Sequence, residues 1–389
     1  MKLNKALFLL ILTSAVGLSG CGKKDKKNPS GQGEQTPSGE QGGEQGDNQT
    51  PAYEIGDKKA EDGTGLMFSE VIGFNTKDAS VIQEDENTRY VVYASNETAK
   101  GKQVFAARKA IKENNKWNYQ EKHVILRPSI DEEAWDQAIF QPSVVKGKFN
   151  LSGTEYHYLM AYQGNEDGTN YNNHIGLAVT NDVLGEWIRV GEDPIIENPE
   201  LFESSFGFGS PSLVSYDQQG KVYLFYSFGE TTLSGTRVKT ADFSDLNHIQ
   251  LEVGYGELPV TGLTGRDDSI TSNAGFAISQ DNKLYYAGDG MPDSSAPGCA
   301  TSFEVAKANL NVIASNAEAW TSIKRVTFLE TMDDERMGWD EIFSPTFITD
   351  AYGRIDTTSG KLEIVYSTFD IDSADSFYTG QLCTFEVTL

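Results

Sequence analysis

The chain has few of the residues that bind metals or form disulfide frameworks, with three cysteines and four histidines among 389 residues. The histidines stand at 123, 157, 174 and 248, without the close spacing of zinc ligands. Cys299 and Cys383 fall near the starts of corresponding strands, the third of each repeat unit, in two adjacent units, and the sequence leaves open whether they form a disulfide or stay separate. No Gly-x-Ser-x-Gly elbow occurs, and the loop glycines lack the strand-to-helix context of a phosphate-binding loop.

Positive charge is also scarce. Lys and Arg together number 32 against 57 Asp and Glu, which gives a net charge of −25 at pH 7. Such a chain is repelled by phosphate backbones and by anionic lipid surfaces, so nucleic acid is excluded as an expected partner. The simplest role for this charge is solubility.

Long apolar runs are missing as well. The apolar stretch 6–16 has 11 residues, well below the roughly 20 that a membrane-spanning helix needs. It follows two lysines and ends in Leu-Ser-Gly-Cys at Cys21, the pattern of a secretory signal. This ending resembles the lipobox of bacterial lipoproteins, which implies cleavage before Cys21 and lipidation (for example with palmitate) of its thiol. An anchor helix that is never cleaved is the alternative.

Residues 22–63 consist largely of Gly, Gln, Glu, Lys and Ser. Such a stretch buries too little apolar surface to fold, and a flexible tether of this length reaches on the order of 35 Å. Because Gly22 is not Asp, the lipoprotein resemblance favours the outer membrane. We therefore divide the chain into a signal peptide (1–20), a lipidated cysteine with a flexible linker (21–63) and a folded domain (64–389).

The folded domain repeats one pattern, in which a polar or small doublet leads into an apolar strand. The steps between successive copies are 63, 69, 63 and 71 residues, measured at the third residue of each copy. The copies are Asp78-Ala79-Ser80-Val81-Ile82, Gln141-Pro142-Ser143-Val144-Val145, Ser210-Pro211-Ser212-Leu213-Val214, Asn273-Ala274-Gly275-Phe276-Ala277 and Ser344-Pro345-Thr346-Phe347-Ile348. A repeat of this length that is rich in short strands is typical of a radial all-β array.

Each copy is followed by a second and a third run of β-branched and aromatic residues, bounded by Gly, Asn and Asp. In the first, second and fourth units a tryptophan then opens a fourth strand, at Trp117, Trp187 and Trp320. We predict an all-β, five-bladed β-propeller. The fifth unit ends after its third strand, so we expect the segment of about 66–72 to pair with the C-terminal strand and close the ring.

This layout resembles the five-bladed glycoside hydrolases of families 43, 32 and 117. The resemblance rests on the opening of the first repeat at Asp78 and on the strand, turn and tryptophan from Ile175 to Trp187. It covers 64–389 as a blade layout and implies a carbohydrate-active protein. Members of family 43 have a general base in the first blade, an Asp that sets the pKa in the second and a Glu that acts as the acid in the third.

Hydrolysis of a glycosidic bond uses two carboxylates, about 6.5–9.5 Å apart in inverting enzymes. Asp78 occupies the position of the family's base, although an Asp that only caps the strand entry is the alternative. The other two family positions fall at Ser143 and near Gly209, so both of those carboxylates are missing.

Other candidates precede the inner strands, where loops reach the same end of the axis. A tryptophan beside an acid suits sugar recognition, because the ring stacks on a pyranose and the carboxylate binds hydroxyls, but packing between blades explains the same pattern. The candidate catalytic residues are Asp78, Asp136, Asp340 and Glu341. The candidate substrate-binding residues are Trp135, Gln141, Arg266, Asp268, Asn273 and Trp339.

Two functions remain open: an anchored glycoside hydrolase acting on a poly- or oligosaccharide, and a non-catalytic glycan-binding lipoprotein that has lost the acids. A platform for protein interactions is a third. The expected partners are a carbohydrate and, through the lipid anchor, a membrane, and we expect a monomer. No cofactor is expected, and the sequence does not specify the axial Ca²⁺ that such folds can hold.

Overall fold

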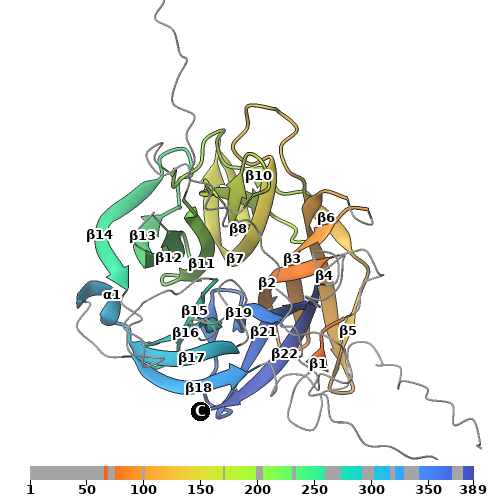
Figure 1. The fold of residues 1–389 in the computed structure, drawn as a ribbon, viewed down its shortest axis with the longest axis vertical. Helices are drawn as coiled ribbons and strands as arrows, with labels where there is room; N and C mark the ends of the chain where they lie inside the picture. Colours follow the sequence, from red (N-terminus) through yellow and green to blue (C-terminus); the bar gives the residue numbers. More distant parts are fainter. Residues whose placement is uncertain are drawn as a thin grey trace, which may run out of the picture.

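The structure is a computed structural model. It describes residues 65–68, 75–98, 101–169, 171–198, 205–229, 234–258, 273–290, 302–315, 320–327, 341–369 and 380–389. Apart from one helical turn, α1 (Val312–Ser315), the secondary structure of these residues is β. Strands lie around a common centre, with the first strand of each repeat innermost (Figure 1). Among the described residues, no helix has the length and apolar character to cross a membrane.

The five copies of the repeated pattern form, or lead directly into, the innermost strands. These are β2 (Thr76–Gln83), β7 (Ala138–Leu151), β11 (Gly207–Ser215), β15 (Gly275–Ser279) and β19 (Glu341–Asp350). Each pairs antiparallel with the second strand of its own repeat. The second strands are β3 (Thr88–Asn96), β8 (Thr154–Asn165), β12 (Lys221–Gly229), β16 (Lys283–Gly290) and β21 (Lys361–Phe369).

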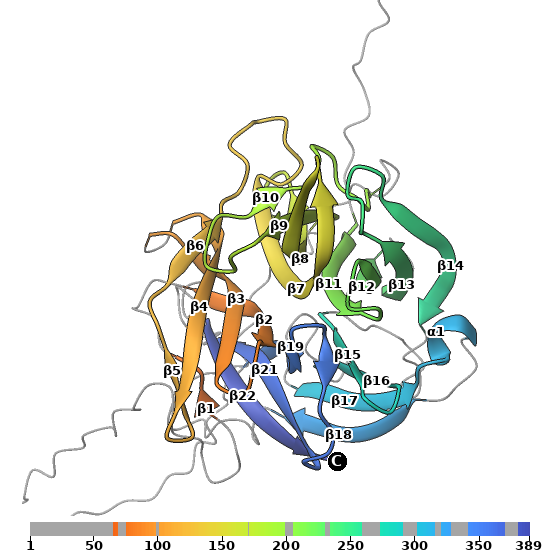
Figure 2. The ribbon, with the colours of Figure 1, turned by 180° about the vertical axis from the view of Figure 1, so that it is seen from behind.

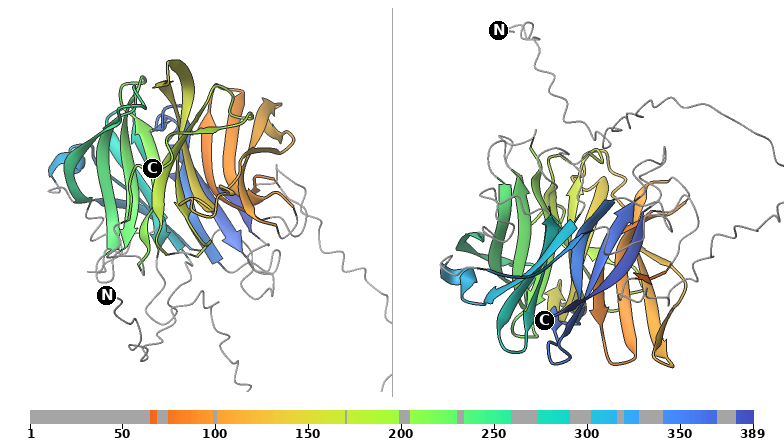
Figure 3. Two further views of the ribbon diagram at one scale, coloured as in Figure 1. Left: turned by 90° about the horizontal axis from the view of Figure 1, so that it is seen from above. Right: turned by 60° about the horizontal axis from the view of Figure 1, so that its bottom comes forward.

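The third strands continue each sheet outward, again antiparallel, as predicted. They are β4 (Gln103–Glu113), β9 (His174–Thr180), β13 (Ser234–Asp242), β17 (Ser302–Asn309) and β22 (Gln381–Thr388). The outer strands of the first four repeats are β5 (Lys116–Tyr119), β6 (His123–Leu126), β10 (Ile188–Arg189), β14 (Gln250–Leu258) and β18 (Thr321–Thr327). The view from behind and the tilted views show the same succession of twisted sheets (Figures 2 and 3).

The N-terminal strand lies beside the last one. β1 (Gly65–Leu66) pairs antiparallel with β22 at Thr384 and Cys383, and the Met67 N–H donates to the Leu382 carbonyl at 3.0 Å. This pairing agrees with the expectation for the segment of about 66–72, of which 69–72 lie outside the described residues.

The innermost strands are fastened to one another by a repeated side-chain contact. Ser80 accepts the Val144 N–H at 3.0 Å, Ser143 accepts that of Leu213 at 2.9 Å, and Ser212 accepts that of Phe276 at 2.9 Å. Each serine therefore satisfies a backbone donor of the next repeat. In the fourth repeat Gly275 stands in the place of the serine, and a Cβ there would lie 2.7 Å from Thr346 Oγ1.

Buried aromatic residues fill the space between the sheets. A tyrosine occupies the same position of the second strand in four repeats, and all four are buried: Tyr93, Tyr162, Tyr226 and Tyr366. The fourth repeat has Gly288 at this position, where a Cβ would meet the Tyr286 hydroxyl at 2.0 Å. The Tyr286 side chain therefore occupies that space, and the repeated core is preserved.

A segment from the end of β19 crosses the C-terminal ends of the other innermost strands. Residues 348–350 pair in parallel with β2, and the carbonyls of Ala351, Tyr352 and Gly353 accept N–H groups from β7, β11 and β15 in turn. β20 (Arg354–Ile355) then pairs in parallel with β15. This axial segment, 348–355, covers that end of the innermost strands with backbone of the chain itself.

Candidate functional site

One non-glycine residue in each copy of the pattern has a left-handed backbone conformation. The φ angles are 53° at Asp78, 51° at Gln141, 49° at Ser210, 49° at Asn273 and 53° at Ser344. The pairing of the first strand shifts register at this point in the four repeats other than the fourth. Positive φ is uncommon for such residues and is concentrated at functional sites. We call these five residues the axial ring.

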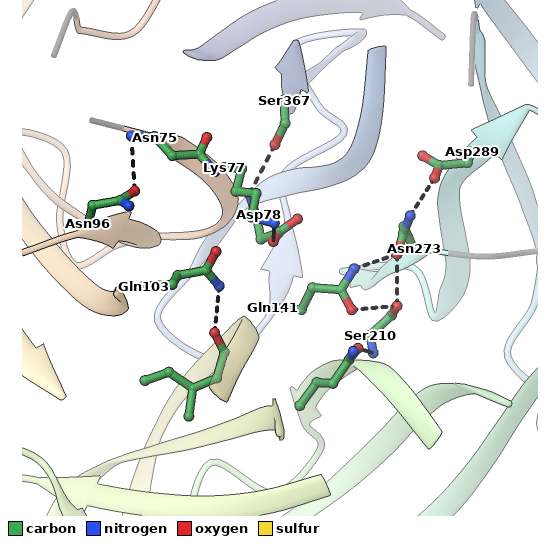
Figure 4. A network of polar contacts seen from close by, with 12 residues as sticks. Asn75, Lys77, Asp78, Asn96, Gln103, Gln141, Ser210, Asn273, Asp289 and Ser367 are labelled. Carbon is green, nitrogen blue, oxygen red and sulfur yellow. Dashed lines mark hydrogen bonds and ion pairs between the residues drawn. The ribbon is translucent and has the colours of Figure 1, made fainter. Parts of the chain in front are cut away.

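Three side chains of the axial ring, those of Gln141, Ser210 and Asn273, contact one another (Figure 4). The Gln141 amide nitrogen donates to Asn273 Oδ1, and the Ser210 hydroxyl lies 2.7 Å from Gln141 Oε1 and 3.1 Å from Asn273 Oδ1. The Ser344 side chain lies near Asp78 and lowers the pKa of its carboxyl. Gln141 and Asn273, which are 132 positions apart in the sequence, thus contribute to one polar network.

A sixth residue, Asp289 of β16, joins the two halves of this network. Its Oδ2 accepts the Asn273 amide at 2.6 Å, and its Oδ1 accepts the Ser344 backbone N–H at 2.7 Å. The side chain is buried, with 6% of the residue surface exposed. The sequence interpretation missed Asp289, because an acid at the end of a second strand carries no signal of its own.

The position of Asp289 follows from a repeated capping contact. For three of the five axial-ring residues, the backbone N–H donates to a side chain on the second strand of the preceding repeat. Asp78 donates to Ser367 at 3.0 Å, Ser210 donates to Gln163 at 3.1 Å, and Ser344 donates to Asp289. Ser367, Gln163 and Asp289 are in the same register, so Asp289 is the charged member of a structural series.

Asp78 is nearly buried, at 5% exposure. Burial raises the pKa of its carboxyl, and the Lys77 ammonium and the Ser344 side chain lower it in part. Lys77 Nζ lies 3.8 Å from Asp78 Oδ2, at the outer limit of an ion pair, while Oδ1 has no hydrogen-bond partner among the described residues. A buried oxygen without a partner is costly, which suits a group that meets a ligand or holds a proton.

Asp78 and Asp289 both lie at Ser344. The Asp289 carboxylate accepts the Ser344 backbone N–H, and the Ser344 side chain is close enough to Asp78 to lower the pKa of its carboxyl. The two acids therefore belong to the same part of the axial ring.

The positions of the second and third repeats that correspond to Asp78 are Gln141 and Ser210, which share its left-handed conformation. Ser143, where the resemblance places a family position, accepts the Leu213 N–H of the next repeat. A Cβ at Gly209 would lie 2.0 Å from Gln163 Oε1. Neither Gln141 nor Ser210 is an acid, so Asp78 is the only carboxylate in the axial ring.

Trp135 and Asp136 form a separate cluster. Asp136 is 1% exposed and accepts Arg189 Nε at 2.7 Å and the Tyr162 hydroxyl at 2.9 Å. The Trp135 ring stacks on Tyr162, with centroids 5.6 Å apart. It also covers Gly164 and Gly176, where a Cβ would lie within 2.6 Å of the ring. These contacts favour the packing interpretation over sugar recognition.

The remaining candidates cannot be placed. Arg266, Asp268, Trp339, Asp340, Cys21 and Cys299 lie outside the described residues. Glu341 is the first residue of β19, but its side chain also lies outside them. Cys383 of β22 is a buried thiol, and burial raises its pKa to about 12. No group of three or more His, Cys, Asp or Glu within the described part of the chain has the arrangement of a metal site.

Comparison with known proteins gives the fold. No protein-family model matches the chain, and no curated protein matches its sequence. Solved structures do match. An α-L-arabinofuranosidase from Lactobacillus brevis has a TM-score of 0.52 and 11% identity, over 81% of this chain and 90% of that one. The fold is that of the propeller glycoside hydrolases.

Two further structures agree with this assignment. Zg3597, a family 117 glycoside hydrolase produced by the marine bacterium Zobellia galactanivorans, matches with a TM-score of 0.52 and 11% identity, over 81% of this chain and 85% of that one. The catalytic domain of a family 62 α-L-arabinofuranosidase from Coprinopsis cinerea matches with a TM-score of 0.52 and 12% identity, over 86% and 94%. A likeness at this identity concerns the fold, and function has to be argued from the site.

Proposed function

We propose that this protein is a membrane-anchored, carbohydrate-active propeller with a glycoside hydrolase-like site that acts on a poly- or oligosaccharide. The observation that carries the proposal is the axial ring, in which one buried carboxyl oxygen of Asp78 finds no partner in the part of the chain that the structure describes. The ring lies toward the starts of the innermost strands, and the axial segment 348–355 covers their other ends. A ligand therefore approaches the ring from the end where the strands begin.

The architecture that belongs to this proposal has five blades, one for each copy of the pattern. The pairing of β1 with β22 supplies the outer strand that the fifth unit lacks. Closure of this kind removes the exposed edge of a partial blade.

In the catalytic form of the proposal, Asp78 acts as the base or as an electrostatic partner, and a second acid protonates the leaving oxygen. Asp340 and Glu341, close to the fifth copy of the pattern, are the candidates from the sequence for this second acid. Asp289 accepts hydrogen bonds at both of its oxygens, so we assign it to positioning the ring and not to proton transfer. Asp136 is paired with Arg189 and buried, so we assign it to packing. Gln141 and Asn273 would bind sugar hydroxyls from the ring, and Arg266, Asp268 and Trp339 would do so from neighbouring loops.

A second function is favoured by a specific observation: four of the five ring positions carry an amide or a hydroxyl, and three of these side chains, Gln141, Ser210 and Asn273, hydrogen-bond within the network. A set of amide and hydroxyl side chains can bind sugar oxygens without transferring protons to or from the sugar. A non-catalytic glycan-binding protein on a hydrolase fold would have this composition.

One experiment separates the two functions. The full-length protein and its Asp78→Asn variant are incubated with arabinan, xylan and agar, and the release of reducing ends is measured alongside binding. Catalysis predicts release that the variant loses while binding persists. Binding without release by either protein supports the second function. The absence of both binding and release on all three polymers contradicts the proposal as a whole.

The membrane anchor is a separate part of the proposal, supported by the lipobox-like ending at Cys21 and by the tether that follows. Expression with a radiolabelled palmitate analogue should label the wild type and not a Cys21→Ser variant, and the wild type should fractionate with the outer membrane. Labelling of both proteins, or of neither, contradicts the anchor without affecting the axial ring.

A further inference from the structure

Asp289 fixes the direction of the hydrogen bonds in the axial ring. Both of its oxygens accept hydrogen bonds, so the Asn273 amide must turn its nitrogen toward Asp289. Asn273 Oδ1 then faces Gln141 and accepts from its amide nitrogen, with the Ser210 hydroxyl oxygen 3.1 Å away. Gln141 must in turn present its nitrogen to Asn273, which leaves its oxygen for the Ser210 hydroxyl.

This direction determines what the ring offers to a ligand. Each primary amide nitrogen carries two hydrogens, and Gln141 Nε2 and Asn273 Nδ2 each use one within the ring. For the second hydrogen of each, the described residues supply no acceptor. Both side chains are half-buried and so retain some exposed surface. The amide groups therefore present donors, while their oxygens are occupied.

A positive charge lies at Asp78 of the ring and near Phe140, the residue that precedes Gln141. Lys77 is half-buried, with 14% of its side chain exposed, and its ammonium is only loosely paired with Asp78 at 3.8 Å. Its Nζ also lies 5.5 Å from the centroid of the Phe140 ring. Burial raises the pKa of Asp78, which weakens the one negative charge of the ring itself.

We infer that the axial ring recognises an anionic oxygen group on a sugar, a carboxylate or a sulfate ester, through the amide N–H groups of Gln141 and Asn273 and the ammonium of Lys77. Asp289 is the positioning residue that fixes both amides as donors. This inference rests on the proposed function, because it names the substrate class of the same site. Charged acceptors gain more from such donors than neutral sugar hydroxyls do.

The first test measures binding by the full-length protein to three probes by calorimetry: trigalacturonate, a sulfated neocarra-oligosaccharide and neutral xylotriose. We expect one of the charged probes to bind at least about ten-fold more tightly than xylotriose, the effect of one charge-assisted hydrogen bond. Which charged probe binds distinguishes carboxylate from sulfate. Equal or tighter binding of xylotriose overturns this inference and leaves the proposed function standing. Binding of none of the three overturns the inference, and the polymer assay then decides the proposed function separately.

Lys77→Gln tests the contribution of the ammonium. The variant should lose most of the preference for the charged probe while its affinity for xylotriose stays within about two-fold, because only the ionic contact is removed. An unchanged preference contradicts the assignment of Lys77.

The second test separates the donor role of Asn273 from its structural role. Asp289→Asn alone brings two amides together and should lower both the melting temperature and the affinity. In the double variant Asn273→Asp with Asp289→Asn, the new Asn donates to the new Asp, which still accepts from Gln141. The fold should recover its melting temperature, but affinity for the charged probe should stay at least about ten-fold weaker, because position 273 no longer donates. Recovery of both properties overturns the inference.

Discussion

Ser344 connects the two acids of the axial site. Its backbone N–H donates to Asp289 Oδ1 at 2.7 Å, and its side chain lies near Asp78 and lowers the pKa of that carboxyl. Ser344 has a left-handed backbone conformation, so its position relative to both acids is constrained. The consequences of this arrangement can be measured.

Asp78→Asn should change how stability depends on pH. Burial raises the pKa of the folded carboxyl above its ordinary value of 3.8, so its contribution to stability is fully present below that value and is lost as pH rises through the folded pKa. An asparagine has no such loss. The stability of the variant relative to wild type should therefore increase from pH 4 toward pH 8 in urea titrations. A difference that is constant with pH, or that falls, contradicts the raised pKa.

Ser143→Ala should destabilise the fold although serine and alanine differ by one oxygen. The substitution leaves the Leu213 N–H without its acceptor, which costs about 1–3 kcal/mol for a buried donor. Gly275→Ser is the informative comparison, because it completes the serine series in sequence but places a Cβ 2.7 Å from Thr346 Oγ1. It too should destabilise. A gain in stability from Gly275→Ser would contradict the described packing of these strands.

The axial segment should depend on Gly353. Its φ is 79°, and a Cβ there would lie 2.8 Å from the Leu213 carbonyl oxygen and 3.0 Å from Val214 Cα. Gly360 has a similar φ of 72° with no atom within 4 Å of a Cβ, so Gly360→Ala measures the backbone strain alone, about 1–2 kcal/mol. Gly353→Ala should cost clearly more in denaturant titrations. Equal costs would mean that the segment does not lie against β11.

Arg189→Ala should reduce stability without affecting glycan binding. It leaves the Asp136 carboxylate buried with only the Tyr162 hydroxyl, at a cost of about 1–3 kcal/mol after allowance for the partial exposure of Arg189. Arg127→Ala, which breaks the solvent-exposed pair with Glu97, should change stability little. If Arg189→Ala loses glycan binding while its melting curve is unchanged, Trp135 and Asp136 take part in glycan binding and the packing assignment is wrong.

The strands could be predicted from the sequence because the same order of apolar and aromatic runs recurs in each repeat. Runs such as those around Val92 and Ala161 are apolar in the same register, and the fold confirms them as second strands. The gathering of Asp78, Gln141 and Asn273 was also predictable, since equivalent positions of a radial repeat converge on its axis. This much follows from periodicity alone.

The remaining features of the site depend on contacts between repeats. Asp289 gains its role from the N–H of Ser344, 55 residues away, and no local pattern marks that pairing. For Trp135 the sequence left sugar recognition and packing both open, because nothing in the sequence shows that Gly164 and Gly176 make room for its ring. The hydrogen bond from the Leu213 N–H to Ser143, and the register shift beside Gln141, are likewise visible only in the structure.

A crystal structure with a bound trisaccharide tests the central claim, that the axial ring is the glycan site, most directly. The account predicts a sugar oxygen within hydrogen-bonding distance of Gln141 Nε2 or Asn273 Nδ2, with the same sugar unit facing Asp78. A trisaccharide held on another face while the ring stays empty would contradict it.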